Sequence, residues 1–285
     1  MEGSKLDEIL QQKLNVLKSY IKELGSLAVA YSGGVDSTFL IKVAYDVLGD
    51  KALAVTARSS TYPEREFNEA IKYIQEIGAR HIAITSEELD VDGFSSNPID
   101  RCYYCKKELF QKVWKVAKEN GIDHIADGSN YDDLNDYRPG MKAAQELKVV
   151  SPLKFAKLTK KDIRALSKEM GLPTWNKPSF ACLASRIPYG QLITREKLSM
   201  IDKAENFLIE LGFRQLRVRH HGNIARIELG EKDYEKILNR DLMKKIAAKL
   251  KDIGFTYVTL DLEGYRTGSM NEVLKESTQY SRSIR

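Results

Sequence analysis

The chain has 285 residues, of which 42% are hydrophobic and 30% carry a charge. These proportions exclude a disordered or fibrous chain and are enough for one large domain or two modest ones with buried cores. The net charge of +5 suits anionic small molecules as well as nucleic acid, so charge alone does not choose a partner. No apolar run approaches the roughly 18 residues of a membrane span and the first residues lack a signal-peptide core, so we expect a cytoplasmic protein without membrane association.

The first part of the chain alternates between helix and strand patterns. Apolar residues at spacings of three and four predict an amphipathic helix over 6–24, and the apolar run 27–31, a Ser/Gly turn and a helix to about residue 47 follow. The same alternation predicts strands at 52–57, 81–85 and 124–130 and helices near 63–78, 105–120 and 159–171. Strands separated by helices of this length indicate an α/β fold, with a parallel sheet covered by helices on both faces.

The order of predicted helices and strands changes beyond residue 190. A helix is predicted over 194–211, strand-like alternation over 216–229, a helix over 231–253 and a strand over 257–265. This order indicates a smaller α+β domain. The Pro-, Ser- and Gly-containing stretch 178–190 is the predicted boundary, which gives domains at 1–180 and 181–285.

A glycine loop follows the first predicted strand, with the sequence Ser32-Gly33-Gly34-Val35-Asp36-Ser37. Glycines let the backbone curve around an anion, the following helix offers unbonded N–H groups, and the serine hydroxyls add donors. The loop matches neither the GxxxxGK[ST] pattern nor GxGxxG. We expect it to bind phosphate, and we assign Ser32, Gly33, Gly34, Asp36 and Ser37 to this site.

The string SGGVDS between a strand and a helix resembles the PP-loop of the ATP pyrophosphatase family, whose fold is of the adenine nucleotide α-hydrolase type. The resemblance implies cleavage of ATP between its α and β phosphates, adenylylation of a substrate oxygen, and Mg²⁺ to offset the phosphate charge. Asp127 and Gly128 follow a later strand and fit the same site, because ligands of parallel sheets bind at the carboxyl ends of strands. Their alternative role is a simple turn. Loop 57–62 also follows a strand and is a weaker candidate for holding the nucleotide.

Four later strings narrow the resemblance: NDYRPGMKAA (135–144), WNKPSFACLASRIPYG (175–190), VRHHGNIARIEL (218–229) and YVTLDLEGYRTGSMN (257–271). Together with the loop they resemble the LarE family of ATP-dependent sulfur transferases over nearly the whole chain. The resemblance implies that ATP adenylylates a carboxylate of pyridinium-3,5-biscarboxylic acid mononucleotide and that a sulfur nucleophile then displaces AMP. Repetition on the second carboxylate gives the bisthiocarboxylic acid used for the nickel-pincer cofactor of lactate racemase. An acyl adenylate supplies the leaving group that a carboxylate lacks.

The resemblance also carries over residues of the second predicted domain, which it makes a sulfur-transfer and substrate-binding domain. Ser185, Arg186, Arg217 and Arg219 match positions that bind the substrate phosphate, and Glu205 matches an acidic active-site position. Two arginines two apart on a strand point to one face, which suits a phosphate dianion. The alternatives are a solvated strand face for the arginines and a solvated helix face for Glu205.

The three cysteines, Cys102, Cys105 and Cys182, are too few and odd in number for a secreted disulfide scaffold. Some family members give up the sulfur of a cysteine in a segment NKxxxCxxSSR; that position here is Ala181, and the thiol is one residue later, at Cys182. We expect instead a [4Fe-4S] cluster held by all three thiolates, with one iron open to hydrosulfide, as in cluster-dependent tRNA thiolation enzymes. A sacrificial Cys182, a structural zinc site, a CxxC redox relay and unrelated cysteines remain alternatives.

Other functions remain open at this point. A tRNA thiolation enzyme would share the PP-loop and the cysteines, but the chain has no zinc-ribbon pairs, no RNA-binding module and no long basic run, and the lysines of 157–161 and 244–251 are predicted to be solvated helix faces. An amidotransferase-type or NAD-synthetase-like enzyme would not need three cysteines, and a non-catalytic carrier would hand sulfur onward. The expected partners are a nucleotide substrate, sulfide or another sulfur donor and other nickel-pincer cofactor synthesis proteins, with no nucleic acid; a homo-oligomer is compatible with the sequence.

Overall fold

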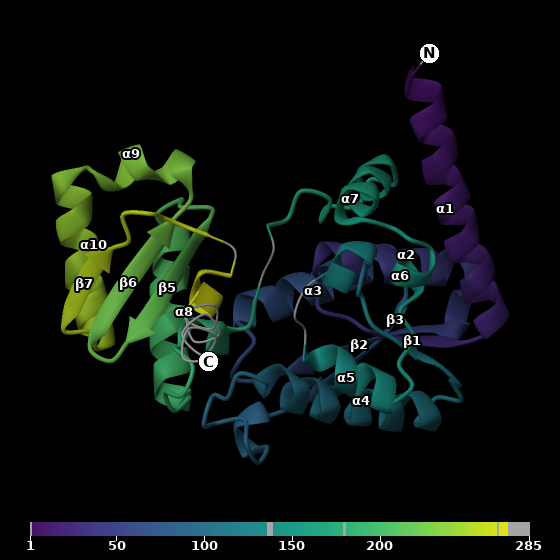
Figure 1. Ribbon diagram of the computed structural model, residues 1–285, viewed down its shortest axis with the longest axis horizontal. Helices are drawn as coiled ribbons and strands as arrows, with labels where there is room; N and C mark the ends of the chain where they lie inside the picture. The colour runs from purple at the N-terminus through teal and green to yellow at the C-terminus, as the bar shows by residue number, and fades with distance from the viewer. Residues whose placement is uncertain (1, 136–138, 179–180, 267, 273–285) are drawn as a thin grey trace, which may run out of the picture. The chain divides into compact units, whose positions relative to one another are not determined.

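The computed structural model describes residues 2–135, 139–178, 181–266 and 268–272, with side chains from residue 8 onward except that of residue 135. The chain divides into two compact units (Figure 1). Residues 1–92 and 100–180 form the first, and residues 93–99 and 181–285 form the second. Each unit has its own hydrophobic core. Among the described residues, no helix is long and apolar enough to cross a membrane.

The first unit is built on a four-stranded sheet in which every pair of neighbours is parallel. The strand order is β3-β2-β1-β4, and the strands are β1 (Leu27–Ala30), β2 (Ala52–Arg58), β3 (Arg80–Thr85) and β4 (Ile125–Ala126). The chain runs outward from β1 to β3 and then returns to the other side of β1. The carboxyl ends of β1 and β4 therefore flank the point where the winding direction reverses, which is where open parallel sheets bind ligands.

Helices cover both faces of this sheet, with α2 and α4 on opposite sides (Figure 1). The helices of the first unit are α1 (Glu2–Leu24), α2 (Val35–Leu48), α3 (Glu64–Ile77), α4 (Arg101–Glu119), α5 (Gly140–Glu146), α6 (Pro152–Phe155) and α7 (Lys160–Glu169). The short helices α5 and α6 have no counterpart among the elements expected from the sequence.

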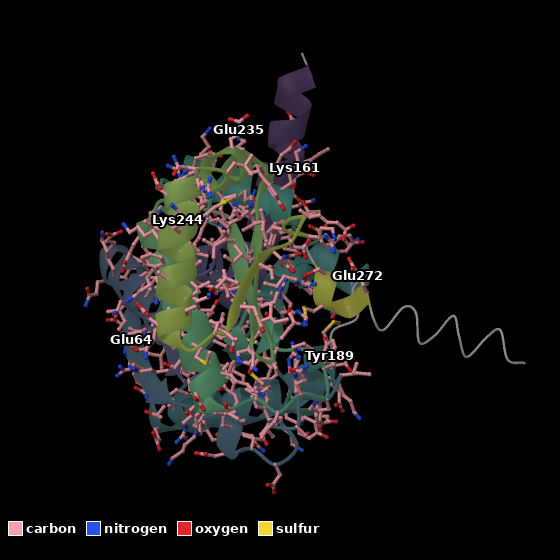
Figure 2. The ribbon with its side chains drawn as sticks, turned by 90° about the vertical axis from the view of Figure 1, so that its left-hand side faces the viewer. Glu64, Lys161, Tyr189, Glu235, Lys244 and Glu272 are labelled. Atoms are coloured by element: carbon pink, nitrogen blue, oxygen red, sulfur yellow. The ribbon has the colours of Figure 1, made fainter. Side chains whose placement is uncertain are left out.

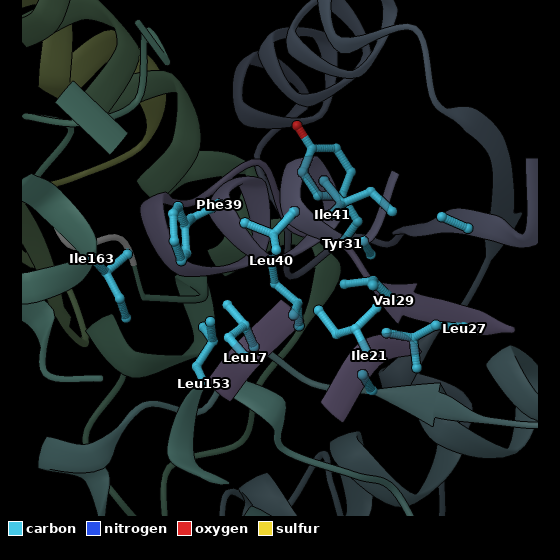
Figure 3. Packing of buried hydrophobic residues seen from close by; sticks show 14 of the residues in the cluster. Leu17, Ile21, Leu27, Val29, Tyr31, Phe39, Leu40, Ile41, Leu153 and Ile163 are labelled. Atoms are coloured by element: carbon cyan, nitrogen blue, oxygen red, sulfur yellow. The ribbon is translucent and has the colours of Figure 1, made fainter. Parts of the chain in front are cut away.

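The alternation of side chains along β1 explains the two layers. Leu27 and Val29 point to the face where Leu17 of α1 and Phe39 of α2 pack (Figure 3). Ala28 points to the other face and joins the cluster formed by α4. Because successive strand residues face opposite sides, a strand that is apolar throughout must be covered twice. The predicted α/β fold with a doubly covered parallel sheet is confirmed.

The second unit contains a three-stranded mixed sheet with the order β5-β6-β7. Its elements are α8 (Arg195–Glu210), β5 (Leu216–His221), β6 (Ile224–Leu229), α9 (Tyr234–Ile237), α10 (Arg240–Ile253) and β7 (Tyr257–Leu260). β5 and β6 are antiparallel, whereas β6 and β7 are parallel. The unit confirms the predicted smaller α+β fold. Lys244 and Glu235 project from α10 and α9 (Figure 2), and the lysines of 244–251 are exposed as predicted.

Local structure departs from the prediction at two places in this unit. The alternating stretch 216–229 is a hairpin, which turns at Gly222 with a φ of 62°. The helix predicted over 231–253 is interrupted, because the Asn239 side chain accepts hydrogen bonds from the N–H groups of Asp241 and Leu242. An asparagine in this role starts a new helix rather than continuing an old one.

Residues 93–99 lie within the first predicted domain along the sequence but pack in the second unit. The Asn97 side chain donates to the carbonyl oxygens of Ile187 and Pro188 at 3.1 and 2.7 Å, and the N–H of Gly190 donates to the carbonyl of Asn97 at 3.0 Å. Phe94, in the same segment 93–99, is buried. A single boundary in the chain therefore does not describe the two units.

Candidate functional site

The loop between β1 and α2 has the backbone of an anion-binding turn. Gly33 has a φ of 61°, and a Cβ there would lie 2.6 Å from the Cβ of Ala70 on α3, so the position requires glycine. Gly34 caps α2 with extended backbone and no side-chain bond, and the helix begins with a bond from the N–H of Thr38 to its carbonyl. The N–H groups of the first helical turn are thus left for a ligand, as at other helix N-termini that bind phosphate.

Hydrogen bonds of two serines stabilise the conformation of the loop. The Ser37 hydroxyl accepts from the N–H of Ser32 at 3.2 Å, lies 3.2 Å from the Ser32 hydroxyl and donates to the carbonyl of Gly34 at 3.3 Å. From the neighbouring loop 57–62, the Tyr62 hydroxyl donates to the Ser32 carbonyl at 2.7 Å. Burial raises the pKa of Tyr62, which keeps this donor protonated. Loop 57–62 therefore supports the glycine loop directly.

Asp127 and Gly128 lie against the same helix end. A Cβ on Gly128 would be 3.2 Å from the backbone nitrogen of Ser37, so the end of β4 approaches the first turn of α2 closely. Both carboxylate oxygens of Asp127 are engaged, by the N–H and hydroxyl of Ser129 and by the Ser151 hydroxyl at 2.7 Å. The structure thus brings the two predicted nucleotide segments together, and Asp127 fixes the local turn.

Asp36 has one engaged and one unengaged carboxylate oxygen. Its Oδ2 accepts from Lys160 Nζ at 2.5 Å, whereas its Oδ1 is buried and has no hydrogen-bond partner among the described residues. An unpartnered carboxylate oxygen beside an anion-binding turn fits a hard cation such as Mg²⁺. Lys160 belongs to the run 157–161 that was expected to be solvated; it is half-buried and bonds Asp36, so that expectation is wrong for this lysine.

Lys177 was not among the predicted site residues, although it lies beside the glycine loop. Its ammonium lies 2.8 Å from carboxylates of Glu66 and Glu69 on α3 and 3.4 Å from the carbonyl of Gly33, and its side chain is 12% exposed. Burial alone would raise the pKa of Glu66, but the Lys177 charge outweighs it and holds that pKa below its ordinary value. Burial opposes ionisation of Lys177 as well, yet the same carboxylates raise its pKa. Its presence in the string WNKPSF was the available signal.

Cys102 and Cys105 lie near the start of α4, three residues apart and hence on one helix face. Cys102 is exposed and Cys105 is half-buried. The Cys105 Sγ is 3.8 Å from Oε1 of the buried Glu88, whose Oε2 accepts from the Thr61 hydroxyl at 3.1 Å. Burial raises the pKa of Glu88.

Cys182 belongs to the second unit, where it is half-buried and precedes the 3-10 turn Leu183–Arg186. Within either unit, no three His, Cys, Asp or Glu side chains of the described residues are grouped as ligands of a metal ion. The two sulfurs of α4 have suitable donor chemistry for iron and zinc.

Arg186 and Glu205 form an ion pair inside the second unit. Arg186 has no exposed surface, and its Nε and Nη2 donate to the two carboxylate oxygens of Glu205 at 2.9 and 3.0 Å. Burial would raise the pKa of Glu205, but Arg186 prevails and keeps it lowered. Neither residue lies on a solvated face, so the solvated-helix alternative for Glu205 does not apply.

Arg217 and Arg219 lie on one face of β5, and they differ in surroundings. Arg219 is buried and donates to the carbonyl of Ser185 at 3.1 Å and to Glu228 at 2.7 Å. Arg217 is half-buried, with its guanidinium 5.0 Å from the ring centre of Tyr265. Burial and then the charge of Arg186 lower the pKa of Arg217. Of the three arginines, Arg186 and Arg219 are thus each paired with a buried glutamate.

The parallel sheet, the glycine loop at its carboxyl edge and the adjoining Asp127-Gly128 turn define a PP-loop protein. The NAD synthase family model matches residues 9–100, which include this loop.

Relatives that match most of the chain narrow the family. A Lactiplantibacillus plantarum protein named pyridinium-3,5-bisthiocarboxylic acid mononucleotide synthase is 40% identical over 94% of this chain and 97% of its own length. The Synechocystis protein slr1717 is 43% identical, with 93% and 99% covered, and MJ0830 of Methanocaldococcus jannaschii is 33% identical, with 91% and 99% covered. The chain belongs to the LarE family.

Proposed function

We propose that this protein is an ATP-dependent sulfurtransferase that converts pyridinium-3,5-biscarboxylic acid mononucleotide into the bisthiocarboxylic acid mononucleotide for the nickel-pincer cofactor of lactate racemase. The observation that carries the proposal is the near full-length similarity to the L. plantarum synthase. The anion-binding geometry of the loop 32–37 supports it independently.

In the first step a substrate carboxylate oxygen attacks the α-phosphorus of ATP, the bond to the β-phosphate breaks and pyrophosphate leaves. Backbone N–H groups of the glycine loop would bind the departing pyrophosphate, with hydroxyls of Ser32 and Ser37 beside them. Asp36 would hold Mg²⁺ through its unpartnered Oδ1, and the metal would offset phosphate charge. Asp127 and Gly128 would complete the nucleotide site from β4.

In the second step a sulfur nucleophile adds to the acyl carbon, the carbon–oxygen bond breaks and AMP leaves. Arg217, Arg219 and Ser185 would bind the substrate phosphate. Burial and the charge of Arg186 disfavour the charged form of Arg217 and lower its pKa, and a phosphate beside it would offset this cost by Coulomb attraction.

Cys102, Cys105 and Cys182 would hold a [4Fe-4S] cluster, which supplies an iron site open to external hydrosulfide. The pairing of Cys102 and Cys105 on one helix face supports this assignment. The alternative within the same function is that Cys182 gives up its own sulfur.

The test is turnover with ATP, Mg²⁺, sulfide and the biscarboxylic acid mononucleotide, on protein purified without oxygen. Pyrophosphate release together with oxygen-to-sulfur replacement, followed by mass spectrometry, is the expected result. No pyrophosphate release with this substrate, but sulfur incorporation into tRNA, would replace the proposal by a tRNA thiolation activity. Iron and acid-labile sulfide in wild type, lost in Cys102→Ala, would distinguish the cluster from a sacrificial Cys182.

A further inference from the structure

The buried Arg186 guanidinium has two sides with different partners. One side faces Glu205, to which Nε and Nη2 donate in parallel. Such a two-point pairing fixes the plane of the guanidinium as well as its position. The other side is therefore aimed in a fixed direction.

That other side faces the chain that carries the cysteine of this unit. Nη1 donates to the carbonyl oxygen of Ala181 at 2.6 Å and to that of Cys182 at 3.0 Å, and lies 2.9 Å from the Ser185 hydroxyl. The Cys182 carbonyl also accepts from the N–H of Ser185 at 3.0 Å. One cation thus binds the carbonyl oxygens of the two peptide groups that flank the Cα of Cys182.

Glu205 is itself anchored in the fold. It extends from α8, and its Oε1 also accepts from the N–H of Val218 on β5 at 3.0 Å. The Glu205 carboxylate is therefore fixed by α8 and β5, whereas residues 181 and 182 belong to no helix or strand. Through the ion pair, residues 181 and 182 are hydrogen-bonded to a side chain that α8 and β5 hold in place.

We propose that the Glu205–Arg186 pair is a positioning device for Cys182, which fixes the main chain on which the thiol is carried. The inference rests on the proposed function, in which Cys182 either binds the cluster or gives up its own sulfur. It differs from the role that the family resemblance implies for Arg186, because the donors that would meet a substrate phosphate are engaged by the carboxylate and the carbonyls. Arg217 remains a candidate for the phosphate, and so does Arg219, whose buried Nε has no hydrogen-bond partner among the described residues.

Lysine cannot reproduce this arrangement. An ammonium is a single nitrogen, whereas the guanidinium presents donors on three nitrogens in a planar fork. In Arg186→Lys the cation can stay with Glu205 or reach the carbonyls, and the charge of the site is kept. The substitution therefore separates positioning from charge.

The experiment measures iodoacetamide alkylation of each cysteine by quantitative peptide mass spectrometry, in the full-length protein freed of iron so that no thiol is held by a cluster. Arg186→Lys should accelerate alkylation of the half-buried Cys182 roughly tenfold, as expected when hydrogen bonds to a charged group are lost. Alkylation of Cys102 and Cys105 should stay within a factor of about two, since they belong to the other unit. Arg226→Lys is the matched control, because Arg226 pairs with Glu228 in the same unit and, among the described side chains, forms no hydrogen bond or ion pair with residues 181–185; it should leave all three rates unchanged.

A second readout links the inference to the reaction. Arg186→Lys should lower the amount of thiocarboxylate formed per pyrophosphate released, while the KM for ATP stays constant. Unchanged Cys182 alkylation in a folded Arg186→Lys protein would overturn the inference, and so would equal acceleration at all three cysteines, which indicates general loosening. If Arg186→Lys does not fold, Glu205→Gln, which keeps one acceptor for Val218, gives the same comparison. Selective alkylation without any sulfur transfer by wild type would refute the proposed function and leave the positioning role standing.

Discussion

The substitution Gly33→Ala tests the geometry on which the nucleotide site depends. The left-handed backbone costs a non-glycine residue about 1–2 kcal/mol. The added Cβ would also lie 2.6 Å from the Cβ and 2.8 Å from the Cα of Ala70, and such overpacking costs typically about 1–3 kcal/mol. We therefore expect the first unit to lose roughly 2–5 kcal/mol of unfolding free energy.

Gly25→Ala is the matched control. Gly25 has a φ of 72°, and an added Cβ there meets no atom within 4 Å, so only the backbone cost of about 1–2 kcal/mol applies. The assay is urea unfolding followed by tryptophan fluorescence, which reports on the first unit because Trp114 and Trp175, the two tryptophans of the chain, both lie in it. Equal midpoint shifts for the two variants would refute the close approach of loop and helix.

Three further predictions concern charges around this loop. Lys177→Met should destabilise the first unit by about 3 kcal/mol in the same assay, the low end for a broken buried pair, because the buried Glu66 carboxylate loses Lys177 but still pairs with Arg65 at 3.0 Å; a shift below that of Gly25→Ala would contradict this. Because Lys177 holds the pKa of Glu66 below its ordinary value of 4.5, the ion pair contributes fully to the unfolding free energy above that pH, and this contribution is lost as the pH falls through the lower folded-state pKa. The wild-type urea midpoint should accordingly fall more than that of Glu66→Gln between about pH 5 and about pH 3, and parallel curves would refute the assignment. Asp36→Asn should weaken Mg²⁺-dependent ATP binding at least roughly tenfold in equilibrium dialysis, since a carboxylate ligand is lost, whereas unchanged affinity would place Mg²⁺ elsewhere.

Local patterns predicted the larger elements well. The apolar strands, the helical spacing of three and four and the glycine loop are each encoded within a short window, and the parallel sheet follows from their alternation. The short helices α5 and α6 span too few turns to show a period. The break at Asn239 was missed because one capping side chain interrupts an otherwise continuous helical pattern.

Contacts between distant segments account for the residues around the glycine loop that the sequence did not reveal. Lys160 reaches Asp36 across 124 positions, and Lys177 reaches Glu69 across 108. No periodicity or motif records such a pairing, because the fold alone decides which of many lysines meets which carboxylate. The close approach of Gly128 to Ser37, in contrast, was foreseeable from the rule that carboxyl ends of neighbouring parallel strands share one edge.

The arginines of the second unit match one family motif, but the structure shows that their surroundings differ. Matching positions assigns Arg186, Arg217 and Arg219 the same phosphate role, since all three carry the same charge. Burial and hydrogen bonding separate them: Arg186 has no exposed surface and holds two carbonyls and a carboxylate, while Arg217 is half-buried and experiences the repulsion of its neighbour. A ligand phosphate gains most where it relieves an existing electrostatic cost and least where it must displace bonds already made. On that ground Arg217→Lys should weaken substrate binding, seen as a higher KM for the mononucleotide, whereas Arg186→Lys should act on the sulfur step.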